Sequence, residues 1–194
     1  MDTMNTVTGI ILAGGKSSRM GQDKGLMIWK GQTFTEHIIE ALDPLVDELF
    51  IVSNSDKYKQ FGLRVYQDVL EDRGPLGGIY TGLSNSDGYR NIIVSCDVPL
   101  ITTNTLHRLI AHDEEQYDII QLSDGSREMP LVAMYKKSCE GPFLDRLEQD
   151  KLKLQAAVSA MKVKTVILPE EKAYTLRNIN TQEDFENLRD AGNS

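Results

Sequence analysis

The chain has few cysteines, no long apolar run and no surplus of positive charge. Its two cysteines, Cys96 and Cys139, are too few for a disulfide framework and lack the spacing of a Cys-x-x-Cys metal site, which fits a reducing compartment. No stretch approaches the roughly 18 apolar residues that cross a bilayer, and no secretory leader is recognisable. The formal net charge of −8 argues against a broad basic face for nucleic acid. We therefore expect a cytoplasmic protein that binds neither nucleic acid nor a membrane.

An apolar run that ends in glycines is the most informative feature present. The residues Val7 to Leu12 predict a strand that is buried on both faces, and Gly14 and Gly15 follow it. Glycines lack the Cβ atom that keeps backbone N–H groups away from phosphate oxygens. Three cations come next: Lys16, Arg19 and Lys24. The pattern is not a Walker A loop, but it favours phosphate binding over the alternative of a glycine turn with solvated charges.

Short β-rich runs alternate with helical patterns along the rest of the chain. Strands are expected at 7–12, 49–52, 64–66, 91–95, 119–122, 131–135 and 163–168. Helices are expected at 34–42, 55–61, 79–83, 106–110, 141–148 and 154–160, and from 181 onward. A capping box from Thr33 to Glu36 precedes the first of them, and a cap near Thr103 precedes the helix at 106–110. This order is typical of a parallel sheet covered by helices, and the turn at 123–126 indicates one hairpin. We expect a single α/β domain over 1–194, with three layers, a mostly parallel central sheet and residues 1–5 disordered.

The residues just after each strand are candidates for a site, because ligands of open parallel sheets lie at the carboxyl ends of the strands. Four such segments, at 14–24, 67–69, 96–99 and 177–181, should converge on one edge of the sheet. Asp97 is the best candidate for a metal ligand, since Mg²⁺ prefers oxygen donors and this carboxylate follows an apolar strand. A turn or helix-capping role is the alternative for Asp97. The neighbouring Cys96 is expected to be a small buried packing residue.

Four motifs in order resemble a known family. Residues 12–24, LAGGKSSRMGQDK, closely resemble the signature of nucleotidyltransferases of the glycosyltransferase-A-like fold and, within them, the molybdenum cofactor guanylyltransferases. Residues 74–78 (GPLGG) look like the second glycine loop of that family, 96–99 (CDVP) like its metal-binding strand end, and 178–181 (NINT) like its C-terminal motif. The resemblance covers nearly the whole chain and implies a Rossmann-like αβα fold.

The resemblance also implies an activity: the transfer of GMP from GTP to the terminal phosphate of molybdopterin, with Mg²⁺ as cofactor and pyrophosphate as the second product. The residues it assigns to GTP are Leu12, Ala13, Gly14, Gly15, Lys24, Asp68 and Asp97. It assigns catalysis to Arg19, Lys24 and Asp97, and the binding of Mg²⁺ to Asp97. It assigns molybdopterin binding to Asn178 and Asn180. The Leu-Ala-Gly-Gly opening favours guanine, because related cytidylyltransferases tend to have Leu-Ala-Ala-Gly. The acceptor phosphate is itself an anionic nucleophile, so positioning and charge neutralisation should carry catalysis.

Other interpretations of the same residues stay open. The alternatives for the whole chain are a cytidylyltransferase, a sugar-phosphate nucleotidyltransferase and a catalytically silent nucleotide-binding accessory protein. Arg19 and Lys24 could instead form surface salt bridges, and Asp68 could be a turn residue. Asn180 or Thr181 could cap the last helix. Relatives often have an asparagine after the second strand, and whether Asn54 takes that place depends on the alignment. The family further implies transient contacts with molybdenum cofactor assembly proteins or apo-molybdoenzymes.

Overall fold

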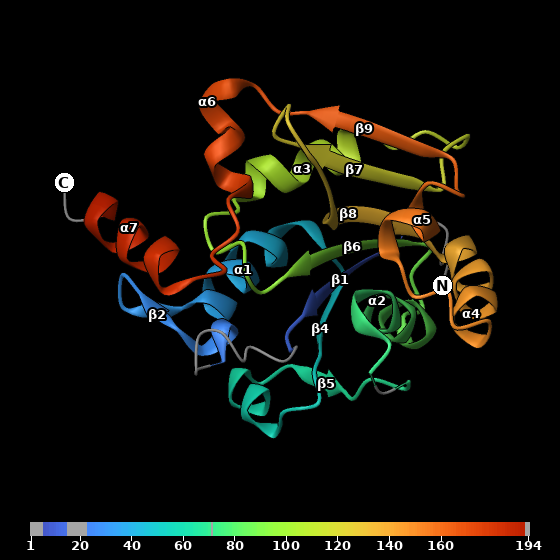
Figure 1. Ribbon diagram of the computed structural model, residues 1–194, viewed down its shortest axis with the longest axis horizontal. Helices are drawn as coiled ribbons and strands as arrows, with labels where there is room; N and C mark the ends of the chain where they lie inside the picture. Colours follow the sequence, from blue (N-terminus) through green and yellow to red (C-terminus); the bar gives the residue numbers. More distant parts are fainter. Residues whose placement is uncertain (1–5, 15–22, 71, 193–194) are drawn as a thin grey trace.

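The structure, a computed structural model, describes residues 6–14, 23–70 and 72–192. A seven-stranded sheet with strand order β5-β4-β1-β6-β8-β7-β9 forms its centre (Figure 1). In that order the strands are Arg64–Tyr66, Glu48–Val52, Val7–Leu12, Arg90–Ser95, Glu128–Lys136, Ile119–Ser123 and Val163–Ile167. The pairings in this sheet are parallel except for the two that β8 makes, with β6 and β7. The mostly parallel sheet and the β7–β8 hairpin are therefore confirmed.

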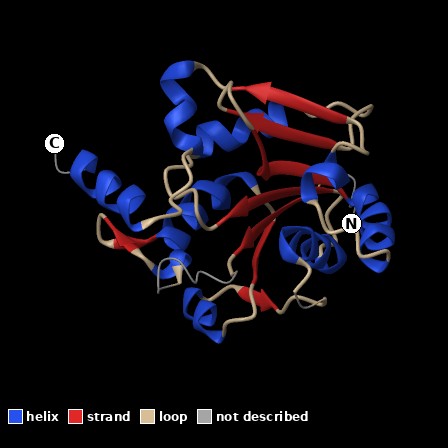
Figure 2. Ribbon diagram, viewed as in Figure 1, coloured by secondary structure: helices blue, strands red, loops and turns tan. Residues whose placement is uncertain are grey.

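Helices cover both faces of the sheet, as Figure 2 shows. In β1 the side chains of Ile10 and Ile11 are fully buried on opposite faces, because successive residues of a strand point in opposite directions. The helices on the Ile10 face are α2 (Gly74–Asn85), α4 (Glu140–Glu148) and α5 (Leu154–Val158), and those on the Ile11 face are α1 (Phe34–Leu42) and α3 (Thr103–Ala111). The predicted three-layer α/β architecture is thus confirmed.

Threonine hydroxyls cap the first turns of α1 and α3. Thr33 accepts a hydrogen bond of 3.2 Å from the backbone N–H of Glu36, and the Glu36 carboxylate accepts one of 2.6 Å from the backbone N–H of Thr33. Thr102 accepts one of 3.2 Å from the backbone N–H of Thr105. The predicted capping box at α1 is confirmed, and the cap expected near Thr103 is its neighbour Thr102.

Two segments differ from what the sequence patterns predict. The patterns do not predict the hairpin of β2 (Ile28–Trp29) and β3 (Gln32–Thr33). Its turn consists of Lys30 and Gly31, whose φ angles of 50° and 84° are both positive. Residues 74–78, expected as a glycine loop ahead of a helix, form the first turn of α2 itself. A proline near the start of a helix removes an N–H that has no partner within the helix, so this proline begins α2 without cost.

The remaining helical segments are short except at the carboxyl end. They are the 3₁₀ helices η2 (Lys24–Leu26), η3 (Asp43–Leu45), η4 (Asp56–Phe61), η5 (Lys137–Cys139) and η6 (Tyr174–Leu176), and the α-helices α6 (Glu170–Ala173) and α7 (Gln182–Gly192). The helix expected at 55–61 is therefore a 3₁₀ helix, and α6 is not predicted by the sequence patterns. Among the helices of the described residues, none is both long enough and apolar enough to cross a bilayer.

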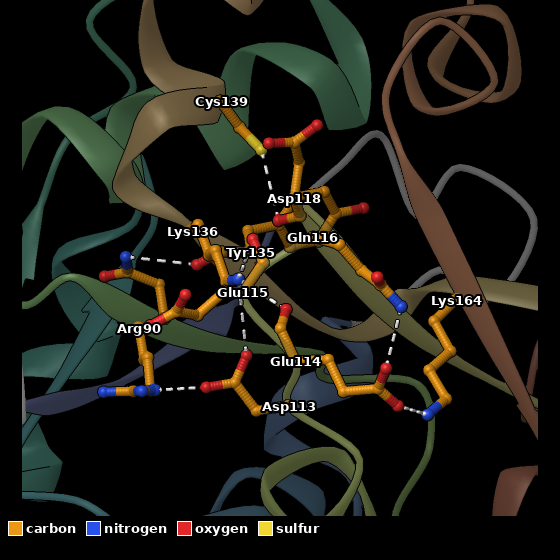
Figure 3. Close-up of polar contacts among 11 residues, drawn as sticks. Arg90, Asp113, Glu114, Glu115, Gln116, Asp118, Tyr135, Lys136, Cys139 and Lys164 are labelled. Atoms are coloured by element: carbon orange, nitrogen blue, oxygen red, sulfur yellow. Dashed lines mark hydrogen bonds and ion pairs between the residues drawn. The ribbon is translucent and has the colours of Figure 1, made fainter.

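A buried polar cluster lies at the end of the sheet where β6 begins and β8 ends. Lys136, only 3% exposed, donates hydrogen bonds of 2.7 and 3.1 Å to the backbone carbonyls of Glu114 and Glu115 (Figure 3). Its ammonium also lies 3.6 Å from a carboxylate oxygen of Asp113, which forms a second ion pair with Arg90. Because this end of the sheet is the amino end of the parallel strands, the cluster lies opposite the edge where a ligand is expected.

Candidate active site

A cleft of about 720 Å³ lies at the carboxyl ends of the parallel strands. Residues that line it include Leu12, Ala13, Gly14, Asn54, Asp68 and Ser95. They follow or end β1, β4, β5 and β6, and the first turn of α2 adds Gly74 and Pro75. Of the four segments expected to converge on this edge, 14–24 and 67–69 contribute lining residues, namely Gly14, Asp23 and Asp68, whereas the cleft takes none from 96–99 or 177–181 among the described residues.

The backbone of the first loop is held between the ends of two neighbouring strands. Ala13 donates a backbone hydrogen bond of 3.0 Å to the carbonyl of Val52, and Cys96 donates one of 3.0 Å to the carbonyl of Leu12. Gly14 then has a φ of +145°, which side chains of L-residues rarely allow. A Cβ atom at this position would still lie 3.7 Å from the Ser53 hydroxyl. Gly14 is thus required by the backbone conformation and not by lack of space.

Asp68 is fixed at the cleft by partners on either side of it. Its carboxylate accepts a hydrogen bond of 2.7 Å from the hydroxyl of Thr81, on α2, and its backbone N–H donates one of 2.8 Å to the side-chain oxygen of Asn54. Burial raises the pKa of Asp68, while the hydrogen bond from Thr81 acts in the opposite direction. Asn54 therefore follows β4, the strand expected at 49–52, and contacts Asp68.

Asp97 lies against the C-terminal motif. Its Oδ2 accepts a hydrogen bond of 3.1 Å from the side-chain amide of Asn178, and its carbonyl accepts one of 2.8 Å from the backbone N–H of Ile179. Oδ1 of Asp97 and Oδ1 of Asn178 are both buried and have no hydrogen-bond partner among the described residues. Buried polar atoms are nearly always paired, so both oxygens are available to accept from or coordinate a ligand.

The donor set at Asp97 suits Mg²⁺, a hard cation that commonly binds through one or two carboxylates together with substrate phosphates and water. Within residues 6–14, 23–70 and 72–192, no three His, Cys, Asp or Glu side chains form a cluster that could hold a metal by themselves. A cation at Asp97 would therefore take most of its ligands from substrate and water, with Asn178 able to add one oxygen.

Lys24 reaches the same C-terminal motif from the first loop. Its ammonium donates a hydrogen bond of 2.6 Å to the side-chain oxygen of Asn180. The hydroxyl of Thr181 accepts a hydrogen bond of 3.1 Å from the backbone N–H of Asp184 at the start of α7. Thr181 therefore supplies the helix cap, which leaves the side chain of Asn180 for Lys24. Lys24, Asp97, Asn178 and Asn180 thus lie together, whereas Gly15, Lys16, Arg19 and residues 1–5 lie outside the described residues.

The two thiols take no part in this site. Burial, with the neighbouring Asp97 carboxylate adding to it, raises the pKa of Cys96 to about 12. Burial likewise raises the pKa of Cys139 to about 12. Both cysteines are free and buried, so the predicted packing role of Cys96 is confirmed.

The hydroxyl of Thr81 is a group that the sequence patterns missed, because a single buried threonine in a helix carries no motif.

Comparisons with known proteins show the family of this chain. A family model described as a MobA-like NTP transferase domain matches residues 9–164. Two relatives described as probable molybdenum cofactor guanylyltransferases are each 36% identical: one from Flavobacterium johnsoniae, covering 95% of this chain and 97% of its own, and one from Carboxydothermus hydrogenoformans, covering 95% and 96%. The solved structure of a molybdopterin-guanine dinucleotide biosynthesis protein A from Archaeoglobus fulgidus has a TM-score of 0.79 over 96% of this chain and 98% of its own. Its 20% identity bears on the fold alone. This chain belongs to the MobA-like NTP transferase family and is a nucleotidyltransferase.

Proposed function

We propose that this nucleotidyltransferase transfers GMP from GTP to the terminal phosphate of molybdopterin. The observation that supports it most is the meeting of Lys24 with Asn180 and of Asp97 with Asn178. A cleft large enough for a nucleotide is lined by Asp23, next to Lys24 in the chain, and by Ser95, two residues before Asp97. Relatives that match nearly the whole chain are described as molybdenum cofactor guanylyltransferases, which supports the choice of both substrates.

The reaction needs no covalent intermediate on the protein. An oxygen of the acceptor phosphate forms a bond to the α-phosphorus of GTP, and the bond from that phosphorus to the α,β-bridging oxygen breaks. The electron pair and the negative charge leave with pyrophosphate. Because the acceptor is already anionic, the protonated thiol of Cys96 has no role as a nucleophile, and catalysis consists of alignment and charge neutralisation.

The described residues divide into a phosphate side and a nucleoside side. Lys24 brings a cation to the phosphates and, through Asn180, connects them with the acceptor side. Asp97, with Asn178 beside it, would hold Mg²⁺. When bound, that ion would neutralise charge on the transferred phosphate and on the departing pyrophosphate. Arg19, assigned by its place in the first motif, would add a planar set of donors to the same phosphates.

On the nucleoside side, the backbone of residues 12–14 would contact the base or ribose of GTP. Asp68 and Asn54, which are joined by a hydrogen bond, would accept from or donate to the sugar or base. The glycine at position 14, in its unusual backbone conformation, is the basis for preferring guanine. We further infer that the reaction takes place in the cytoplasm, where free cysteines persist, and that the product passes to cofactor-assembly proteins or apo-molybdoenzymes.

The experiment is a nucleotide panel with the purified protein, Mg²⁺ and molybdopterin. Pyrophosphate release is measured with GTP, CTP, ATP and UTP, and the dinucleotide product is identified by mass spectrometry. Release with GTP that depends on the acceptor, and that is lost in Lys24→Ala, supports the proposal. Preferential use of CTP would make the chain a cytidylyltransferase. Pyrophosphate release only when a sugar phosphate replaces molybdopterin would make it a sugar-phosphate nucleotidyltransferase. A protein that binds GTP but releases no pyrophosphate with any acceptor would be an accessory protein.

A further inference from the structure

The residue after Lys24 lies against two buried hydroxyl groups. A Cβ atom added to Gly25 would come within 2.3 Å of the hydroxyl of Tyr58 and within 2.8 Å of the hydroxyl of Thr35. Contacts that short do not occur, and the atoms involved belong to side chains packed in the interior. Any side chain at position 25 would therefore push this segment away from the body of the protein.

Both hydroxyls also bond to the residues on either side of Lys24. Tyr58, on η4, is fully buried, and its hydroxyl donates to a carboxylate oxygen of Asp23 at 2.5 Å. Thr35, in the first turn of α1, is fully buried and donates a hydrogen bond of 2.8 Å to the carbonyl of Gly25. Burial raises the pKa of Tyr58 far above its ordinary value, so the phenol keeps its proton and remains a donor.

The backbone of Lys24 is constrained in addition by its own turn. Its carbonyl accepts a hydrogen bond of 3.0 Å from the backbone N–H of Met27, which closes η2. Lysine has a flexible four-carbon stem, so its ammonium can be aimed reliably only where the backbone that carries it is fixed. The contacts at Asp23 and Gly25 supply that fixed base for the 2.6 Å contact of Lys24 with Asn180.

We propose that Tyr58 and Thr35 are positioning residues that hold the segment Asp23–Gly25 so that the ammonium of Lys24 meets the substrate phosphates. They act through Lys24 and touch no substrate. The proposal rests on the proposed function in one respect, the assignment of Lys24 to the phosphates. A displacement of about 1 Å in a catalytic group can cost up to roughly a hundredfold in rate, so loss of one hydroxyl should be measurable in turnover.

The test is Tyr58→Phe, which keeps the ring and removes the hydrogen bond to Asp23. We expect kcat to fall about tenfold while KM for GTP stays within about twofold, because the hydrogen bonds that hold Asp68, to Thr81 and Asn54, do not involve Tyr58. Tyr135→Phe is the matched control: Tyr135 is also fully buried, and its hydroxyl donates a hydrogen bond of 2.7 Å to the carbonyl of Pro130. It should lose a similar amount of thermal stability with kcat unchanged. Equal kcat in the two variants would overturn the proposal.

A second pair of variants keeps the test decisive if Tyr58→Phe does not fold. Thr35→Val removes the hydroxyl that binds the Gly25 carbonyl, and Thr35→Ser retains one. We expect Val, which keeps the shape of threonine but not its hydroxyl, to reduce kcat, and Ser, which keeps the hydroxyl, to retain it. An effect of shape alone would instead impair Ser and spare Val, and would overturn the proposal.

The double variant Tyr58→Phe/Lys24→Ala separates this proposal from the one on which it rests. If Tyr58 acts through Lys24, removing its hydroxyl causes no further loss of kcat once Lys24 is alanine. If Lys24→Ala is inactive and Tyr58→Phe is normal, the positioning role fails and the proposed function stands. If Lys24→Ala is fully active, the assignment of Lys24 fails, and the positioning role fails with it.

Discussion

The side-chain amide of Asn178 donates a hydrogen bond of 3.1 Å to Oδ2 of Asp97, and Oδ1 of each side chain remains buried without a partner among the described residues. A second contact, from the backbone N–H of Ile179 to the carbonyl of Asp97, is 2.8 Å long. Asp97 is therefore held both through its side chain and through its backbone. If a cation binds in the way we propose, this carboxylate would need little reorganisation to hold it, which is the property that electrostatic catalysis requires.

We expect Asp97→Asn to reduce Mg²⁺-dependent turnover roughly a hundredfold or more, because it removes the charge that would hold the metal. The backbone hydrogen bond from Ile179 does not depend on the side chain, so the thermal midpoint should change little. The measurement is pyrophosphate release over a range of Mg²⁺ concentrations, with the unfolding midpoint of the same sample. Turnover close to that of the unchanged protein would remove Asp97 from the metal site.

Lys24→Ala should separate catalysis from stability. The contact of Lys24 with Asn180 is exposed, and an exposed contact of a charged group contributes about 1 kcal/mol or less to stability. A cation that neutralises charge developing in the transition state, where water is excluded, lowers the activation barrier by several kcal/mol, which raises the rate on the order of a hundredfold or more. We therefore expect a large loss of kcat with a nearly unchanged unfolding midpoint. A shift in the midpoint with normal kcat would make the contact merely structural.

The order of the elements could be predicted because their signals are local. The apolar run of β1 and the capping box at Thr33 each lie within a few neighbouring residues, and both are found where the patterns indicate. The hairpin β2–β3 was not predicted, because its strands of two residues each are too short to show the alternation of apolar and polar residues that marks a strand. The start of α2 was misjudged because glycine and proline favour loops on average, although a helix can begin with both.

The candidate site was predictable only where its residues belong to motifs. Lys24, Asp97 and Asn180 occur in three separate motifs, which lie in segments expected to converge on one edge of the sheet. Tyr58 and Thr81 were not predictable, because each acts through one buried hydroxyl on an element that has no motif of its own. Their importance depends on contacts between residues distant in sequence, which only the folded chain brings together.

Thr81→Val should change the pH dependence of GTP use. Burial raises the pKa of Asp68, and the hydrogen bond from Thr81 opposes that rise by stabilising the carboxylate. Removing the hydroxyl should therefore raise the pKa of Asp68 further. If the ionised carboxylate binds GTP, the acid limb of kcat/KM moves to higher pH in Thr81→Val and returns in Thr81→Ser. An acid limb that stays fixed in both variants would exclude ionised Asp68 from GTP binding.

Asp68→Asn is the companion variant, because asparagine can still accept the hydrogen bond from Thr81 but carries no charge. A carboxyl whose pKa is raised in the folded protein stabilises the fold at low pH, and this contribution is lost as the pH rises through the folded-state pKa. The variant should therefore be at least as stable as the unchanged protein at neutral pH while its KM for GTP rises. A loss of stability at neutral pH would contradict the assigned direction of the shift.

Lys136→Met should cost stability without affecting catalysis. The substitution removes the ammonium that bonds to the backbone carbonyls of Glu114 and Glu115, of which the Glu114 carbonyl keeps a hydrogen bond of 3.1 Å from the backbone N–H of Tyr117. It also removes one of the two cations beside Asp113 (Figure 3). Hydrogen bonds to a charged group contribute about 1.5–3 kcal/mol each, and the buried Asp113 carboxylate loses one of its cations, so the free energy of unfolding should fall by roughly 3 kcal/mol. Because the cluster lies at the opposite end of the sheet from the cleft, kcat of the folded variant should stay within about twofold.

Lys164→Met is the control for this prediction, since Lys164 pairs with the same segment at a more exposed place. Its partner is the side chain of Glu114, and the two side chains are 23% and 47% exposed. Exposed ion pairs contribute about 0–1 kcal/mol, so urea unfolding should distinguish the two lysines clearly. Equal losses of unfolding free energy in the two variants would mean that burial of the Lys136 ammonium adds nothing to stability. A fall in kcat of Lys136→Met at unchanged stability would instead connect this end of the sheet with the reaction.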